Sequence, residues 1–188
     1  MSNHQFIKDY LQDFSSLLKP NDELTQELVK VRDLLVEVAS TNKKVLILGN
    51  GGSAAIASHL SVDLTKNAKI RCLNFNEASL ITCFANDYGF EYWAEKAIDF
   101  YGDPGDLLIV ISSSGQSQNM INAVKAARNG GFYSVITLSG FLETNPLKEL
   151  GDINLWVNNK SYNFVENIHQ IWLLAITDLV IGKREYKA

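Results

Sequence analysis

Hydrophobic residues near the N-terminus recur at helical spacing in two neighbouring segments. Apolar side chains lie three or four positions apart over residues 5–18, and the same spacing returns over residues 24–38. Pro20 lies between the two segments, and proline interrupts a helix because it lacks an N–H group. The pattern therefore predicts an antiparallel pair of amphipathic helices.

Short apolar runs alternate with segments of helical composition along the rest of the chain. Residues 106–111 are apolar on both faces, as expected of a strand buried between helix layers. Residues 80–84 fit either a strand or a helix. The other predicted strands are residues 44–48, 70–75, 133–138 and 153–157, and the predicted helices are residues 54–66, 92–101, 118–128 and 162–181.

This alternation predicts an α/β fold. Strands that are separated by helices pair in parallel through right-handed crossovers, and helices then cover both faces of the sheet. Ligands of such sheets bind at the carboxyl ends of the strands. With 188 residues and no linker-like segment, the chain is expected to form one domain.

Composition excludes several classes of function. The net charge is -4, and no run of Lys and Arg is interleaved with aromatic residues, so we expect no direct nucleic-acid binding. The two cysteines do not form a Cys-x-x-Cys pair, and the first residues lack a signal-peptide pattern, which indicates a reduced, cytoplasmic protein. The apolar segment 171–181 is shorter than a membrane span, so we expect no membrane insertion.

The first candidate loop is residues 49–53, which read Gly-Asn-Gly-Gly-Ser between a predicted strand and a helix. Glycines let the backbone approach a ligand, and the unpaired N–H groups of the following helix attract an anion. A simple tight turn is an equally good explanation of one such loop. A loose dinucleotide fingerprint also fits, but no acidic residue near Asn74 or Asn76 is placed to bind a ribose.

The second candidate loop is residues 112–117, which read Ser-Ser-Ser-Gly-Gln-Ser before a helix. Hydroxyl and N–H groups at a helix N-terminus can surround the oxygens of a phosphate. A Ser-rich helix start is often only a cap, but two such loops in one sheet favour phosphate binding. A nucleotide-hydrolysing P-loop is excluded, because no Gly-Lys-Ser/Thr follows either loop.

Four strings together resemble the sedoheptulose-7-phosphate isomerase (phosphoheptose isomerase) branch of the sugar-isomerase (SIS) family. They are Gly-Asn-Gly-Gly-Ser at 49–53, Asn-Asp-Tyr-Gly-Phe at 86–90, Ile-Ser-Ser-Ser-Gly-Gln-Ser at 111–117 and Ile-His at 168–169. The resemblance implies a three-layer α/β/α sandwich, flavodoxin-like, with a parallel five-stranded sheet. It also implies a cytoplasmic homotetramer with active sites between subunits, in which residues 1–40 serve oligomerisation and residues 41–188 form the core.

The resemblance also implies which residues bind a phosphorylated sugar. The sugar would contact the first loop and one later pair, namely Asn50, Gly51, Gly52, Ser53, Asn86 and Asp87. The phosphate would be held by hydroxyls of the second loop, namely Ser112, Ser113, Ser114 and Ser117.

Isomerisation of a ketose phosphate to an aldose phosphate requires a base next to the carbonyl and an acid or metal to stabilise the enediol. His59 and Asp63 share one helix face, and Glu166 and His169 share another, although such isolated pairs are more often surface contacts. In the resembling enzymes, zinc is bound by a His, a Glu, a Gln and a final His.

This chain departs from that set of ligands. Asp63 replaces the Glu, Glu166 replaces the Gln, and Leu174 replaces the final His, while His59 is retained. Asp63 and Glu166 are therefore the candidate catalytic residues, and His59, Asp63 and Glu166 are a tentative zinc set. Because Asp is one methylene shorter than Glu, Asp63 is displaced from the reacting carbon, and a displacement of about 1 Å can lower a rate roughly a hundredfold.

Two functions follow as hypotheses. The first is a phosphoheptose isomerase, or a related aldose–ketose phosphate isomerase, in heptose synthesis for lipopolysaccharide or capsule. The second is a non-catalytic SIS binding protein that resembles the replication-initiator-associating proteins, and Leu174 favours it. A nicotinamide-binding protein is a third, weaker alternative.

Overall fold

A computed structural model of the chain describes residues 1–184, and its centre is a parallel sheet of five strands. The spatial order is β2-β1-β3-β4-β5, and every neighbouring pair is parallel, which confirms the predicted α/β fold. The strands are β1 (Val45–Gly49), β2 (Cys72–Asn74), β3 (Leu107–Ser112), β4 (Ser134–Ser139) and β5 (Ile153–Trp156).

Helices connect these strands as the sequence pattern predicts. They are α1 (Asn3–Leu17), α2 (Asp22–Ser40), α3 (Gly52–Lys66), α4 (Ala78–Tyr88), α5 (Trp93–Tyr101), α6 (Gln118–Asn129), α7 (Pro146–Leu150) and α8 (Tyr162–Ile181). The ambiguous residues 80–84 are helical, because they fall inside α4. The short helix α7 was not predicted.

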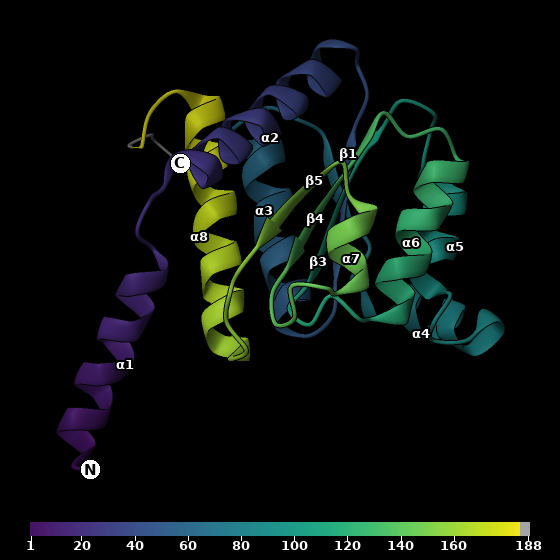
Figure 1. Ribbon diagram of the computed structural model, residues 1–188. Helices are drawn as coiled ribbons and strands as arrows, with labels where there is room; N and C mark the ends of the chain where they lie inside the picture. Colours follow the sequence, from purple (N-terminus) through teal and green to yellow (C-terminus); the bar gives the residue numbers. More distant parts are fainter. Residues whose placement is uncertain (185–188) are drawn as a thin grey trace.

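Two helical layers cover the sheet, so the molecule is a three-layer sandwich (Figure 1). Helices α2, α3 and α8 pack on one face, and α4, α5, α6 and α7 pack on the other. Residues of β3 alternate between the two cores: Ile109 faces the first and Leu108 the second. Both are fully buried, as the apolar character of both faces of this strand predicts.

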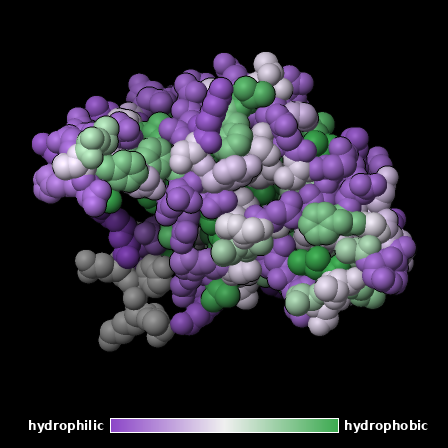
Figure 2. Space-filling model, turned by 90° about the horizontal axis from the view of Figure 1, so that it is seen from below, coloured by the Kyte–Doolittle hydropathy of each residue, from purple (hydrophilic) through white to green (hydrophobic). Residues whose placement is uncertain are grey.

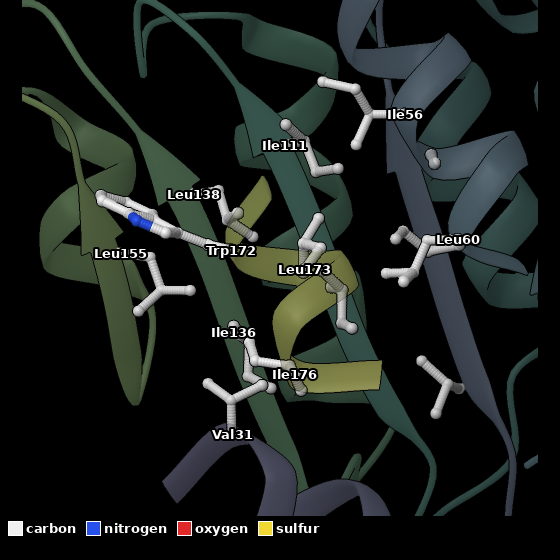
Figure 3. Close-up of a cluster of buried hydrophobic side chains, with 14 of the residues drawn as sticks. Val31, Ile56, Leu60, Ile111, Ile136, Leu138, Leu155, Trp172, Leu173 and Ile176 are labelled. Carbon is white, nitrogen blue, oxygen red and sulfur yellow. The ribbon is translucent and has the colours of Figure 1, made fainter. Parts of the chain in front are cut away.

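The first core lies between the sheet and α8 (Figure 3). Trp172, Leu173 and Ile176 of α8 point toward Leu138 and neighbouring strand residues, and α2 closes the cluster from a third side. The helix α8 is 20 residues long and apolar enough to pass a length-and-composition test for a membrane span. The apolar stretch therefore extends beyond residues 171–181, and α8 buries one face in this core, as a core helix does.

The expected antiparallel pairing of the first two helices is wrong. Figure 1 shows α1 leading away from the body of the molecule, whereas α2 packs on the sheet. No residue of α1 is buried, and it contacts the body through the partly buried Leu17 and through Tyr10 and Phe14, whose ring centroids lie 4.5 and 5.7 Å from that of Phe164. Nearer the N-terminus of the helix, Phe6, Ile7 and Leu11 are exposed.

Candidate functional site

The first loop follows β1 at the carboxyl edge of the sheet. Gly51 adopts φ 55° and ψ -123°, a conformation that side-chain-bearing residues rarely take, and it forms the N-cap of α3. An amide side chain satisfies the backbone at the end of β1: Asn76 Nδ2 donates to the Gly49 carbonyl oxygen at 2.7 Å. Asn74 donates similarly to Ile47, so the residues at the end of β2 support the loop and offer no ribose-binding carboxylate.

Three of the helices that start at this edge, α3, α6 and α8, lack side-chain caps. Gly51 of α3, Ser117 of α6 and Ser161 of α8 make no side-chain hydrogen bond to their own helices. In contrast, side chains cap the helices α1, α2, α4 and α7. The N-terminal dipoles of α3, α6 and α8 are therefore available to an anionic ligand.

The second loop is held from behind by α7. Gly115 adopts φ 66°, and a Cβ at this position would overlap the side chain of Asn145. The fully buried Asn145 amide donates to the carbonyls of Gly140 at 3.2 Å and Leu142 at 2.7 Å. The Leu147 N–H donates to the Gly115 carbonyl at 3.1 Å, so the loop has a fixed shape without a ligand.

The serines of this loop differ in their partners. Ser112 Oγ donates to Ser117 Oγ at 3.1 Å, which joins the two ends of the loop. Ser114 Oγ accepts from the Gln116 N–H at 3.3 Å. Ser113 is 5% exposed, and within residues 1–184 its hydroxyl lies near the Glu166 carboxyl without making a well-formed hydrogen bond. A buried hydroxyl without a well-formed hydrogen bond is costly, so Ser113 is suited to receive a ligand oxygen.

A pair of amides joins the two loops. Asn50 Nδ2 donates to Asn119 Oδ1 at 3.0 Å, and Asn119 Nδ2 donates back to Asn50 Oδ1 at 2.9 Å. Asn119 lies in the first turn of α6 and is 3% exposed. The loops that the sequence predicted to cooperate are thus connected directly, through a residue that the sequence reasoning did not select.

Glu166 of α8 brings a carboxyl group to the first loop. Its carboxylate lies against Gly52, because a Cβ at Gly52 would overlap the carboxylate atoms. Burial raises the pKa of Glu166, and the nearby Ser113 hydroxyl acts in the opposite direction. The group therefore holds its proton to higher pH than an exposed Glu, which suits an acid–base residue.

His59 and Asp63 form a second polar group on α3, one that extends to α8. His59 Nε2 lies 3.4 Å from Asp63 Oδ2, and His59 Nδ1 lies 3.2 Å from Gln170 Nε2. Asn67 Nδ2 donates to the other Asp63 oxygen at 3.1 Å. The predicted catalytic Asp63 is thus contacted by two side chains, and Gln170, which contacts His59, is a member of the group that the sequence reasoning missed.

The tentative zinc set does not come together within one chain. Among residues 1–184, no three side chains of His, Cys, Asp or Glu are arranged to hold a metal ion. Glu166 contacts Gly52, whereas the ring nitrogens of His59 face Gln170 and Asp63. Zinc therefore stays a prediction from the resemblance, and metal analysis of the purified protein would test it.

Asn86 and Asp87 lie on the outside of α4. Both side chains are exposed, and Asn86 Nδ2 donates to Asp87 Oδ1 at 2.9 Å. Within residues 1–184 neither side chain hydrogen-bonds to the two loops. Sugar contact by this pair stays a prediction that one chain does not complete.

His169 is a structural residue below the site. It is fully buried, and its Nε2 lies 3.1 Å from the carbonyl oxygen of Ser139 at the end of β4. Burial lowers the pKa of His169 to about 4, so the ring is neutral at physiological pH.

The chain is similar to known sugar isomerases over most of its length. A model of the SIS domain matches residues 9–140. The phosphoheptose isomerase of Fusobacterium nucleatum is 35% identical over 92% of this chain and 91% of its own length, and that of Aliarcobacter butzleri is 32% identical over 93% and 94%. The solved structure of the phosphoheptose isomerase GmhA from Neisseria gonorrhoeae is 27% identical, with a TM-score of 0.88 over 95% of this chain and 99% of its own.

Proposed function

This chain belongs to the SIS-domain family, within its phosphoheptose isomerase branch, and we propose that it interconverts a ketose phosphate and an aldose phosphate. The observation that carries the proposal is the pair of hydrogen bonds between the first loop and the helix that follows the second loop, with a carboxyl group of raised pKa beside the first loop. A phosphate belongs in loop 112–117 and sugar hydroxyls belong in loop 49–53.

The reaction moves one hydrogen between neighbouring carbons. A carboxylate removes a proton from C1 of the ketose while the C2 carbonyl oxygen gains a proton, which gives the enediol. Removal of the O1 proton and return of a proton to C2 then give the aldose. Glu166 and Asp63 are the two carboxyl groups proposed for these transfers. The raised pKa of Glu166 supports its role as a proton donor.

Sedoheptulose 7-phosphate is the proposed substrate, because relatives over nine-tenths of the chain are phosphoheptose isomerases. The test is a conversion assay with sedoheptulose 7-phosphate and other ketose phosphates, with and without added zinc. Asp63→Asn is the matched variant, because it keeps the side-chain size and removes the carboxylate at the position where the resembling enzymes have Glu. Conversion by the wild type and its loss in Asp63→Asn are the expected results; no conversion of any ketose phosphate overturns the proposal. Synthesis of heptose for lipopolysaccharide or capsule is the pathway that such an activity would serve.

A homotetramer is part of the same proposal. In Figure 2, which views the molecule from below Figure 1, hydrophobic side chains gather in separate patches over α1 and α4. Phe6 of α1 is 57% exposed, and an isolated helix of 15 residues is marginally stable in water. Packing of α1 and α4 against other copies would cover these patches and bring Asn86 and Asp87 to a neighbouring site. Light scattering that reports a monomer at micromolar concentration would overturn this part.

One feature favours a second candidate, a non-catalytic phosphosugar-binding protein. Leu174 stands on α8 where the resembling enzymes have their final His, and it can neither transfer a proton nor bind a metal. This candidate requires that calorimetry detects sugar-phosphate binding while the conversion assay detects no product. A partner protein that co-purifies with the chain would support it further.

A further inference from the structure

We propose that Gln170 is a positioning residue that fixes the proton of His59 on Nε2 and thereby orients the Asp63 carboxylate. The inference rests on the proposed isomerase function, in which Asp63 transfers a proton. It concerns a residue that lies one helical turn beyond Glu166 on α8 and that the family resemblance did not select.

The contacts form one polar chain between two neighbouring helices. The Gln170 amide nitrogen lies 3.2 Å from His59 Nδ1, and His59 Nε2 lies 3.4 Å from Asp63 Oδ2. Asn67 donates to the second Asp63 oxygen at 3.1 Å. The side chain of Asp63 is 17% exposed, so these contacts replace much of its solvent shell.

The donor and acceptor properties of these groups decide where the proton lies. An ionised carboxylate only accepts hydrogen bonds, so the His59 nitrogen that faces Asp63 is the one that carries a proton. In the neutral ring the other nitrogen, Nδ1, is then an acceptor and requires a donor. The Gln170 amide N–H supplies that donor, whereas a leucine could not supply one.

The consequence for Asp63 is a fixed orientation. With His59 Nε2 at 3.4 Å from one oxygen and Asn67 donating to the other, rotation of the carboxylate is restrained. Without Gln170, Asp63 alone favours the Nε2–H form, so the Nδ1–H form, which leaves no donor toward Asp63, becomes more populated. Loss of such supporting hydrogen bonds typically lowers activity roughly 10- to 100-fold.

The test compares Gln170→Leu and Gln170→Glu with the wild type in the full-length protein. Nitrogen NMR reads the protonation site of the His59 ring, which is identified among the three histidines by its loss in His59→Asn. We expect Nε2–H in the wild type, a mixture of both forms in Gln170→Leu, and protons on both ring nitrogens in Gln170→Glu, because each nitrogen then faces a carboxylate, which only accepts. Asn167→Leu is the control, since the exposed Asn167 side chain bonds only to the Asn163 carbonyl of its own helix.

Kinetics supply the second readout. Gln170→Leu is expected to lower kcat at least 10-fold with little change in KM, because the phosphate-binding loops are untouched. Unchanged nitrogen signals in Gln170→Leu, or an unchanged kcat, would overturn the inference. If the wild type converts no ketose phosphate, the proposed function fails, and the nitrogen signals still decide whether Gln170 sets the His59 proton.

Discussion

The two ends of the parallel sheet use polar residues in opposite ways. At the amino ends of the strands, Asp106 accepts from the Lys44 N–H at 3.0 Å and the Asp103 N–H at 2.9 Å, and pairs with Lys44 Nζ at 2.6 Å. Asp152 likewise accepts from the two terminal nitrogens of the Arg128 guanidinium, the Ser134 hydroxyl and the Val135 N–H. At this end the polar groups satisfy one another.

At the carboxyl ends several polar groups lack internal partners. The helices α3, α6 and α8 begin without side-chain caps, and Ser113 buries a hydroxyl that makes no well-formed hydrogen bond within residues 1–184. The difference suits the amino end to stability and the carboxyl end to the proposed binding of a ligand. Substitutions at either end of the sheet test this division.

Removal of the buried carboxylate at the amino end should have the largest effect. Asp106→Ala leaves Lys44 with only the exposed Asp103 and leaves two backbone N–H groups without an acceptor. We expect the free energy of unfolding to fall by about 3–5 kcal/mol, measured by urea denaturation. Sugar-phosphate affinity of the folded fraction should stay within twofold of the wild type; a larger loss would contradict the separation of the two ends.

The buried His169 differs from its neighbours at the carboxyl end, because it contributes stability and is not placed to bind a ligand. Its pKa is lowered to about 4, so the folded state favours the neutral ring. The resulting stability is complete above pH 6.5 and is lost as the pH falls from 6.5 toward 4, by about 3 kcal/mol in total.

Urea denaturation of the wild type and His169→Gln across this pH range checks the prediction. The variant should be less stable at pH 7 and should lose less stability on acidification. Parallel stability curves of the two proteins would show that His169 does not cause the pH dependence.

Gly52→Ala should affect function at the carboxyl end without a matching loss of stability. The added methyl group meets the flexible end of Glu166, which can move away, so we expect a stability change within about 1 kcal/mol. The displaced carboxyl group should lower the isomerisation rate roughly 100-fold. In a Glu166→Ala background the same substitution should have little further effect on the rate. Additive effects in this double-mutant cycle would exclude the contact as the cause.

Separation of the two loops should have the smallest effect of the series. Asn119→Ala removes two hydrogen bonds to Asn50, which together contribute about 1–2 kcal/mol. We expect a roughly tenfold weaker affinity for inorganic phosphate or a sugar phosphate by calorimetry. Asn122→Ala is the matched control on the same helix, because Asn122 bonds to Glu91 and Gln118 instead of a loop. Equal losses in both variants would mean that α6 is merely destabilised.

Much of the fold was predictable, because buried parallel strands are marked by continuous apolar runs. The predicted limits of α8 match the structure, and those of β3 and β4 differ by one residue. The short α7 was missed since it spans five residues and offers little periodicity. The predicted packing of α1 against α2 was wrong. An amphipathic stripe shows that one face of a helix must be covered, but it does not identify the partner that covers it.

The site was predictable where backbone geometry requires particular residues. Gly51 and Gly115 take positive φ values, which is why both loops were visible in the sequence. Asn119 and Gln170 were not visible, because each acts through a partner that is distant in sequence: Asn50 is 69 residues away, and His59 is 111 residues away from Gln170. A polar residue inside a helix does not indicate which distant side chain it will contact.

The paired amides of Asn50 and Asn119 make the site sensitive to the length of its ligand. Because each amide holds the other in place, the distance between the two loops is set by the protein and does not adjust to the ligand. A molecule that engages both loops must carry its phosphate and its hydroxyls at matching separation along the carbon chain. Sugars that are too short would reach one loop only, so chain length itself becomes a criterion of selection.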